Sequence, residues 1–329
     1  MATIWLWLII LFSMCFPMKA TTDTICMSPP VRVISIAELL ERNSTGTTAT
    51  TVGNNSEGPH ATVPEASALD GLQPSSNHND FCLDVQNTTN LNTQATGLLQ
   101  RKANCTIFQE HSLDWDELAS VNNFCAGNGY RPPKCGPTDP EHTRASAGVG
   151  FIIARPHNAI DVPPQTDSFK DAVATGRCNH HAIEIGCSTT VSVYNLYGWT
   201  GGHTNPIAAG RTNKLVCSCH AEMDQHPPGP RLLVGDLNAE PEDLVQLMHM
   251  TTEEHWVDIG KHADKWGKQP EQNTCKAPNA TDATRRDFIF ANNEALALIK
   301  DFQVIDDQLF PVHATLRLIL RGDRVLRYR

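Results

Sequence analysis

Apolar runs with strand character alternate with amphipathic segments from Phe81 almost to the end of the chain. The clearest run is RLLVG at 231–235, which has a proline before it and an aspartate after it. Short apolar runs bounded by turn-forming residues are typical of buried strands. We therefore predict strands at 81–85, 105–110, 148–154, 181–186, 190–198, 231–235, 286–291, 301–306 and 314–320.

Four segments between these runs have the periodicity or the start signals of helices. Apolar spacing predicts helices over 91–102 and 113–126. A third helix is predicted over 206–225, because Asn205 is a good N-cap and Pro206 is tolerated at the first helical position. A fourth is predicted to start at Pro241 and to place three apolar side chains on one face: Leu244, Leu247 and Met248.

The ratio of strands to helices indicates the fold class. Many strands with only a few helices between them favour an α/β protein in which each apolar sheet face is covered by another layer. We therefore predict a four-layer α/β sandwich, with two packed β-sheets flanked by helices.

The sequence before Phe81 divides into an apolar leader at 1–20 and a polar linker at 21–80. The run IWLWLIILFSMCF carries no charge, is short for a bilayer span and suits a secretory signal peptide cleaved after Ala20. An uncleaved membrane anchor and an accidental apolar start of a fragmentary reading frame remain alternatives. The linker is rich in Ser, Thr, Asn, Gly and Pro and cannot bury enough apolar surface to offset ordering entropy.

The remaining sequence is predicted to form one domain over 81–320, followed by a basic tail at 321–329. Five arginines and one aspartate lie between Arg317 and Arg329, and we expect a solvated end there. Localisation follows from the leader: we expect a secreted protein if it is a signal peptide, and a nuclear or cytoplasmic one otherwise. We expect a monomer, with no stable membrane partner beyond the leader.

Composition narrows the function classes. Hydrophobic residues make up 40% and charged residues 19% of the 329 residues, which excludes a fully disordered or fibrous chain. Lys and Arg number 26 against 36 Asp and Glu, and the formal charge of -10 argues against electrostatic binding of nucleic acid over the whole surface. A nuclease remains open, because metal-binding carboxylates and a local basic rim are compatible with an acidic total.

The cysteines give no strong signal for a metal site. An even number, ten, follows the leader, which suits disulfides, but Cys82 and Cys105 lie in strand-like runs where buried thiols are expected. The tight cluster of Cys217, Cys219 and His220 has no second ligand pair at zinc spacing. We therefore do not predict a structural zinc site.

Polar side chains gather where the predicted strands end. In LLVGDLNAEP, Asp236 and Asn238 follow an apolar strand two residues apart, so both side chains can face one ligand. Taken alone, this pattern also fits a turn with a helix cap. Its weight comes from similar positions elsewhere, because α/β sheets place ligands at the carboxyl ends of strands. Glu110 and Tyr197 end predicted strands. Asp287 lies in a predicted strand, and His313 comes just before the last one.

In this combination the sequence resembles the endonuclease/exonuclease/phosphatase superfamily, the metal-dependent phosphodiesterases with the DNase I-like fold. The resemblance rests on LDVQNTTNL, QEH, NLYGWTGGH, GDLNAEP, RRDFIF and LFPVHATL, in the family's order, and covers about 81–320. These motifs are most similar to those of the nuclease domains of LINE-type retroelements. A free-standing domain and a fragment of a retroelement polyprotein both fit.

The resemblance implies a role for each matching residue. Asn87 and Glu110 match the family's metal-site residues, and Tyr197 the tyrosine that orients the phosphate. Asp236 matches the aspartate that aligns or deprotonates the attacking water, and Asn238 the asparagine that contacts the scissile phosphate. A carboxylate and histidine pair, Asp287 and His313, would stabilise the charge that develops on the phosphorus centre.

The implied cofactor is Mg²⁺ or Mn²⁺, and the implied activity is phosphodiester hydrolysis, with DNA as the expected substrate. Oxygen ligands such as Glu110 suit Mg²⁺, which needs only one or two carboxylates. Val312 stands where most members have an aspartate before the histidine, so we expect weaker support for a second metal and lower activity. A phospholipid or inositol phosphate substrate, and a catalytically decayed domain that only binds nucleic acid, remain alternatives.

Several residues also have simpler explanations. Asn87 lies in an Asn-Thr-Thr glycosylation sequon, although we favour the active site. His180 and His181 are expected to face solvent. Trp199 and Trp266 are expected to pack in the core or at its rim rather than stack on bases.

Overall fold

A computed structural model describes residues 80–141, 146–186, 188–278, 280–307 and 309–322. The predicted leader, the linker up to Asn79 and residues 323–329 of the predicted tail lie outside the described residues. Within the described ranges, no helix is long and apolar enough to cross a membrane.

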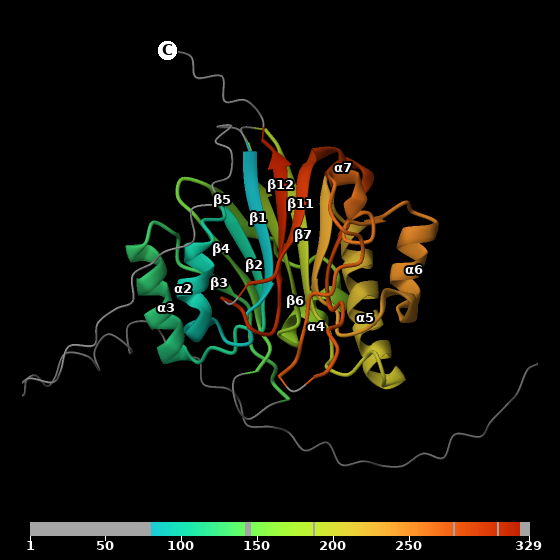
Figure 1. Ribbon diagram of the computed structural model, residues 1–329, viewed down its shortest axis with the longest axis horizontal. Helices are drawn as coiled ribbons and strands as arrows, with labels where there is room; N and C mark the ends of the chain where they lie inside the picture. The colour runs from blue at the N-terminus through green and yellow to red at the C-terminus, as the bar shows by residue number, and fades with distance from the viewer. Residues whose placement is uncertain (1–79, 142–145, 187, 279, 308, 323–329) are drawn as a thin grey trace, which may run out of the picture. The chain divides into compact units, whose positions relative to one another are not determined.

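Two six-stranded mixed sheets form the centre of the domain (Figure 1). The first has the order β11 (Ile299–Ile305), β12 (Thr315–Arg321), β1 (Asp80–Asn87), β2 (Cys105–Gln109), β4 (Val149–Ile153) and β3 (Lys134–Cys135). The second has the order β5 (Asn158–Asp161), β6 (Cys178–Glu184), β7 (Thr190–Tyr197), β8 (Arg231–Asp236), β10 (Asp287–Ala291) and β9 (Val257–Asp258). Each sheet has one parallel pair at its centre, β1 with β2 and β7 with β8.

Helices cover the outer face of each sheet, which gives the four layers predicted from the sequence (Figure 1). On the first sheet lie α2 (Leu91–Gln100) and α3 (Trp115–Gly127). On the second lie α4 (Asp167–Ala174), α5 (Pro206–Met223) and α6 (Val245–Thr252). The short elements are η1 (Pro241–Asp243), η2 (Ala263–Trp266) and α7 (Asn293–Leu298).

Side-chain alternation along the strands builds the core between the sheets. Leu83 and Val85 of β1 pack in one cluster with Val193 of β7 and Val234 of β8. The alternate residues point outward, so Phe108 of β2 packs against the layer that contains α2 and α3. Apolar side chains on both faces of both sheets therefore fix the order of the layers.

At one end of the sandwich, the inward-facing positions become polar. The alternation that buries Leu83 and Val85 continues to Asn87, and the alternation that buries Leu232 and Val234 continues to Asp236. Because β1 and β8 each end at this edge, the apolar core gives way there to buried polar groups. In Figure 1 this end lies at the bottom, where β12 begins.

All nine predicted strands are present, with bounds that differ by a few residues. The elements missed by the sequence pattern are the short strands β3, β5 and β9, the short helices α4 and α7 and the 3₁₀ turn η2. Two to four residues carry little periodicity, so short edge strands have no clear local signal. The helices predicted over 91–102, 113–126 and 206–225 correspond to α2, α3 and α5.

The helix predicted from Pro241 is interrupted. A 3₁₀ turn over Pro241–Asp243 is followed by Leu244 in an extended conformation, and α6 begins only at Val245. Leu247 is buried on α6 as expected, but Met248 is 37% exposed, because the break rotates the helical face. Met250 takes the buried position that was predicted for Met248.

The prediction that His180 and His181 face solvent was wrong, because both are buried in β6. His180 stacks on Tyr194, with ring centroids 4.1 Å apart, and His181 Nδ1 lies 2.9 Å from Asp161 Oδ1. Burial lowers the pKa of His180 to about 3 and also lowers that of His181. Two adjacent histidines in a strand face opposite sides, so one reaches the helix layer and the other the core between the sheets.

The start of the predicted basic tail also needs correction. Arg321 ends β12, and Arg317 lies inside that strand with its Nε 2.7 Å from Asp84 Oδ1. Arg317 is therefore part of a buried ion pair and not of a solvated end. Only 323–329 stays a predicted tail, outside the described residues.

The other packing predictions agree with the structure. Cys82 and Cys105 are buried free thiols, and Trp266 packs against the core between the sheets. His220 Nε2 is hydrogen-bonded to the Glu254 carboxylate at 2.8 Å.

Candidate active site

The polar end of the sandwich brings the predicted site residues together from both sheets. Tyr197 and Asp287 are the register partners of Asp236 on the two strands beside β8. Asn87 approaches from the opposite sheet and donates a hydrogen bond from Nδ2 to Asp236 Oδ2, 2.8 Å away. His313 precedes β12 and lies with its Nε2 4.0 Å from the same oxygen.

Asp236 is the buried centre of this cluster, with 2% of its surface exposed. Its Oδ2 accepts from Asn87, and its Oδ1 accepts from the backbone N–H of Asn238 at 3.0 Å. Burial and the nearby charge of Asp287 raise the pKa of Asp236 to about 7. A carboxyl with a pKa near neutrality is well suited to accept a proton from water.

Glu110 follows β2 directly, and its backbone is left-handed, with φ of 56°. That region is costly for most residues with a side chain, and such strain is common at functional sites. Burial raises the pKa of Glu110, and hydrogen bonds from the side chains of Asn87 and Tyr197 partly offset this effect. The carboxylate is therefore held between the ends of β1 and β7.

Asn87 connects two of the acids. Its side chain is hydrogen-bonded to both Glu110 and Asp236, and its Oδ1 accepts from the backbone N–H of Thr89 at 2.8 Å. Only 2% of its surface is exposed, which does not suit a glycosylated surface loop. The position supports the active-site interpretation of this asparagine over the sequon.

His313 and Asp287 form the predicted pair. His313 Nδ1 lies 2.9 Å from Asp287 Oδ2, and the His313 carbonyl accepts from Gln86 Nε2 at 3.2 Å. Burial by itself lowers the pKa of His313, but the charge of Asp287 outweighs burial and raises that pKa well above its ordinary value. The ring is therefore an imidazolium at neutral pH, with Nε2 directed at the region of Asp236.

Asn238 borders the cluster in a half-buried position. Its Nδ2 donates to the carbonyl of Gly198 at 3.2 Å, and its backbone φ of 51° is again left-handed. A Cβ on Gly198 would lie 1.9 Å from the carbonyl oxygen of Leu237, so a side chain at this position would push the two loops apart. Glycine at 198 therefore allows the β7 loop to hold Asn238.

Sequence reasoning missed Arg177, which supports Tyr197 from behind. The guanidinium lies 5.1 Å from the ring centroid of Tyr197 and 4.7 Å from that of Trp199. Its Nη2 is 2.8 Å from Asp139 Oδ2, and both side chains are buried. An arginine at a strand start has no distinctive local signal, so only the stacked geometry identifies this role.

Cys275 was also missed. Its Sγ lies 3.7 Å from His313 Nε2, and its backbone forms isolated bridges with both Thr284 and His313. The thiol is half-buried, whereas the other site groups are mostly enclosed. Nothing in the segment NTCKAP distinguishes this cysteine from the other thiols.

A pair of amides joins the two sheets behind Glu110. Gln109 Nε2 donates to Asn195 Oδ1 at 2.6 Å, and Asn195 Nδ2 donates to the carbonyl of Phe108 at 3.0 Å. Both side chains are fully buried, and hydrogen-bonded amides in a core fix the relative position of the elements that carry them. The cross-link helps to hold Glu110 opposite Tyr197.

The donor set fits a hard divalent cation. Glu110 and Asn87 offer carboxylate and amide oxygens, which are the ligands of Mg²⁺ and Mn²⁺. A cation would also favour the ionised form of Glu110, which burial disfavours. Asp236, Asp287 and His313 form a second group with ligand atoms within 4.8 Å of one another, but its members already bond to each other and to Asn87.

Val312 lies directly before His313 and is partly buried. Its backbone carbonyl accepts a hydrogen bond from Lys276 at 2.8 Å, so it pairs with the segment that carries Cys275. The valine side chain has no ionisable group, so it contributes no negative charge beside His313. The negative charge near His313 therefore comes from Asp287 and Asp236.

No protein-family model matches this sequence, and no curated protein matches it. Solved structures do match. A 3′ phosphatase, NExo from Neisseria, determined with a product DNA hairpin, has a TM-score of 0.55 and 17% identity over 73% of this chain and 99% of that one.

Two further structures illustrate the range of the match. The AP endonuclease LMAP from Leishmania major has a TM-score of 0.58 and 14% identity over 75% of this chain and 89% of that one. The endonuclease domain of TRAS1, a telomere-specific non-LTR retrotransposon, has a TM-score of 0.51 and 14% identity over 74% of this chain and 98% of that one. This chain therefore has the DNase I-like fold of the endonuclease/exonuclease/phosphatase structures, as its sequence resemblance implied.

Proposed function

We propose that this protein is a Mg²⁺-dependent phosphodiester hydrolase, and specifically an endonuclease that cuts a DNA backbone. The observation that carries the proposal is the convergence of Glu110, Asn87, Asp236 and the Asp287–His313 pair on one buried edge of the two sheets. The similar structures include nucleases and a phosphatase, which supports hydrolysis of a phosphate ester.

Asp236, His313 and Asp287 each have a separate role in the proposed hydrolysis. Asp236, with a pKa near neutrality, aligns the attacking water and accepts its proton. The His313 imidazolium donates a hydrogen bond from Nε2 to a non-bridging oxygen, where negative charge develops. Asp287 holds the ring through Nδ1 and keeps it charged.

Four further residues position the phosphate and the cation. Glu110 and Asn87 would hold the divalent ion, which neutralises charge on the phosphate oxygens when bound. Tyr197 stays a phenol, because burial raises its pKa, and its hydroxyl is shared between Glu110 and the substrate. Asn238 extends the set of donors toward the scissile phosphate.

The test is a substrate panel with the full chain. The panel contains supercoiled plasmid, an abasic-site duplex, a single-stranded RNA, a phosphatidylinositol phosphate and the small diester bis(p-nitrophenyl) phosphate. We expect nicking of DNA with Mg²⁺ or Mn²⁺, loss of nicking with EDTA, and loss in His313→Ala. DNA that stays intact under every metal condition would contradict the endonuclease proposal.

The same panel separates the two alternatives. Turnover of only the inositol phosphate would favour a small-phosphoesterase, which the net charge of -10 also suits. Binding of DNA without turnover of any substrate would favour a decayed nucleic-acid-binding domain, for which Val312 is the supporting feature.

A further inference from the structure

Arg286 differs from the other enclosed arginines in having no carboxylate partner among the described residues. Four others pair closely with an acid, at distances between 2.7 and 3.0 Å: Arg101 with Asp307, Arg177 with Asp139, Arg285 with Asp258 and Arg317 with Asp84. Arg286 is 6% exposed, so it is as enclosed as they are.

The contacts of Arg286 satisfy only part of its guanidinium. Its Nε donates to Thr284 Oγ1 at 3.0 Å, while its Nη1 is fully buried and has no hydrogen-bond partner in the described part of the chain. A buried cation without a counter-charge costs several kcal/mol by general estimates. We therefore expect the unpaired guanidinium to bind an anionic group of a ligand.

Arg286 lies beside the catalytic groups. It precedes Asp287, and its backbone carbonyl accepts from the N–H of Leu237 at 2.9 Å, one residue before Asn238. Because side chains alternate along β10, Asp287 faces the space between the sheets and Arg286 faces the helix layer. The Arg286 backbone therefore lies beside the loop of the predicted phosphate-contacting asparagine, and its side chain lies outside the cluster of acids.

His203 is a second basic residue near Arg286. Burial and the charge of Arg286 both lower the pKa of His203, so the two side chains are within electrostatic range of each other, while Glu240 acts in the opposite direction. The His203 backbone N–H donates to the carbonyl of Asn238 at 3.1 Å. His203 itself is exposed, so a ligand can reach it.

The start of α5 adds two features that suit an anion. The helix has eighteen residues and begins directly after Asn205, so its positive end faces this loop. His203, Thr204 and Pro206 also line a hollow of about 340 Å³, with Asp243 on its wall. The charge of Asp243 disfavours a phosphate near its wall of the hollow, so the His203 side suits an anion better.

We propose that Arg286 and His203 bind a second backbone phosphate of the substrate strand, adjacent to the phosphate held by Asn238. This inference rests on the proposed function. It makes the substrate a polynucleotide, because a phosphomonoester or a small diester has no second phosphate to reach Arg286. Arginine suits this role through its planar set of donors.

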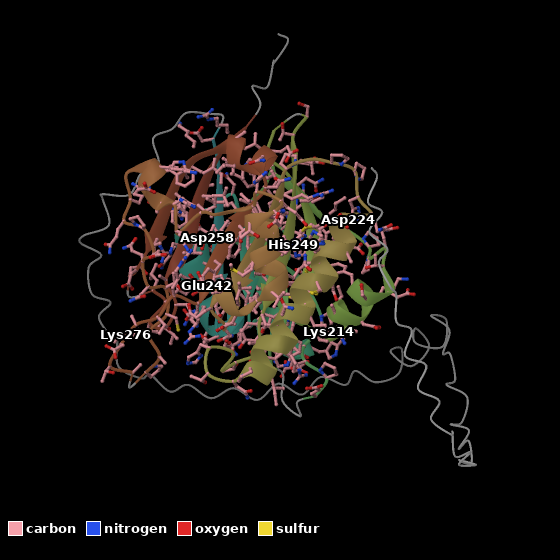
Figure 2. The ribbon with its side chains drawn as sticks, turned by 90° about the vertical axis from the view of Figure 1, so that its right-hand side faces the viewer. Lys214, Asp224, Glu242, His249, Asp258 and Lys276 are labelled. Atoms are coloured by element: carbon pink, nitrogen blue, oxygen red, sulfur yellow. The ribbon has the colours of Figure 1, made fainter. Side chains whose placement is uncertain are left out.

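A local cationic position also explains how an acidic protein can hold a strand. Figure 2 shows Lys276, on the loop after Cys275, and Lys214, on α5, in the lower half of the view. The site end of the sandwich lies in the same half. Both lysines are exposed. Arg286 would fix the register of the strand, whereas the lysines add only general attraction.

The test compares a long and a short substrate. The full chain and Arg286→Gln are assayed on an oligonucleotide duplex and on bis(p-nitrophenyl) phosphate, with KM and kcat measured separately. We expect the loss of kcat/KM on the oligonucleotide to exceed the loss on the small diester by about tenfold to a hundredfold, mostly through KM. The salt dependence of oligonucleotide binding should fall by about one charge in slope.

Two variants complete the design. Arg286→Lys restores the charge and should recover part of the loss, while Lys170→Gln, an exposed α4 residue paired with Asp167, should match the unmodified protein. Equal losses on both substrates, or no loss, would overturn the inference. If neither substrate is hydrolysed by the unmodified protein, the proposed function fails, and anisotropy with the oligonucleotide decides separately whether Arg286→Gln weakens binding.

Discussion

Asp236 and Asp287 lie opposite each other on the antiparallel strands β8 and β10, and both carboxylates face the buried space between the sheets. Two acids in such a position repel each other unless one of them is protonated or a cation lies nearby. His313 supplies a positive charge between them, 2.9 Å from Asp287 and 4.0 Å from Asp236. The repulsion between the two carboxylates lowers the stability of the folded protein, but it gives Asp236 a pKa that suits proton transfer.

Asp236→Asn should make the metal-free protein more stable and inactive. The pKa of Asp236, about 7 in the folded protein, lies above that of an unfolded aspartate, so the unmodified protein loses stability as pH rises from about 4 to 7. The asparagine does not titrate. We expect its advantage in free energy of unfolding to grow over this interval by at most about 1.4 kcal/mol per pH unit. Urea unfolding in EDTA between pH 4.5 and 7.5 measures it, and a margin independent of pH would contradict the argument.

Asp287→Asn should lower the pKa of His313, because the anion that holds the imidazolium is removed. Hydrolysis should fall by about 10²–10³, and the basic limb of the pH–rate profile should move to lower pH. His313→Gln should cost a similar factor, and the double variant little more, since both residues act through one ring. Additive losses would show that Asp287 acts independently of His313.

Glu110→Gln should weaken the cation site. The amide can keep the hydrogen bonds from Asn87 and Tyr197 through its carbonyl oxygen, but it loses the charge that attracts a divalent ion. We expect the Mg²⁺ concentration for half-maximal activity, and the Kd for Mn²⁺ by calorimetry, to rise about tenfold or more. The exposed Glu253→Gln is the matched control, and an unchanged Mn²⁺ affinity at Glu110→Gln would exclude it as a ligand.

Arg177→Met should destabilise the protein and slow hydrolysis together. The change removes the cation that stacks on Tyr197 and Trp199 and leaves Asp139 without this partner. Breaking a buried ion pair from one side costs about 3–5 kcal/mol, and the tyrosine loses its support. Thermal unfolding and kcat are measured with Arg211→Met as the control, because Arg211 stacks on Trp199 from an exposed position. A stable variant with normal kcat would contradict the positioning role.

His180→Phe should improve stability in acid. The pKa of His180 is lowered to about 3 by burial, so the unfolded chain binds the proton more tightly between about pH 6.5 and pH 3. The unmodified protein therefore loses stability as pH falls through this window, by about 1.4 kcal/mol per unit at most. Phenylalanine can keep the stacking on Tyr194 without titrating. Unfolding at pH 7.5 and 5.0 should show the variant's relative gain only at the lower pH.

The local pattern was sufficient for nine of the twelve strands among the described residues and for naming the proposed site residues. Alternating apolar positions in segments such as LLVGD are set by the side-chain period of a strand, which is a property of a few consecutive residues. The seven proposed site residues could be named because polar groups at strand ends stand out against apolar runs, and because the order of motifs resembles a known family. Met248 was misplaced because a break in the helix, caused by the extended backbone of Leu244, lies beyond what periodicity shows.

The sequence by itself predicted the nine longer strands, the four layers and the residues that we propose carry the chemistry. The tertiary structure decided which of them meet: Asn87 and Asp236 are 149 positions apart, and sheet packing alone places them 2.8 Å from each other. It also decided the burial of His180, the support of Tyr197 by Arg177 and, among the described residues, the lack of a carboxylate partner at Arg286. These properties depend on pairings between distant segments, whose register is fixed by the whole core and not by neighbouring residues.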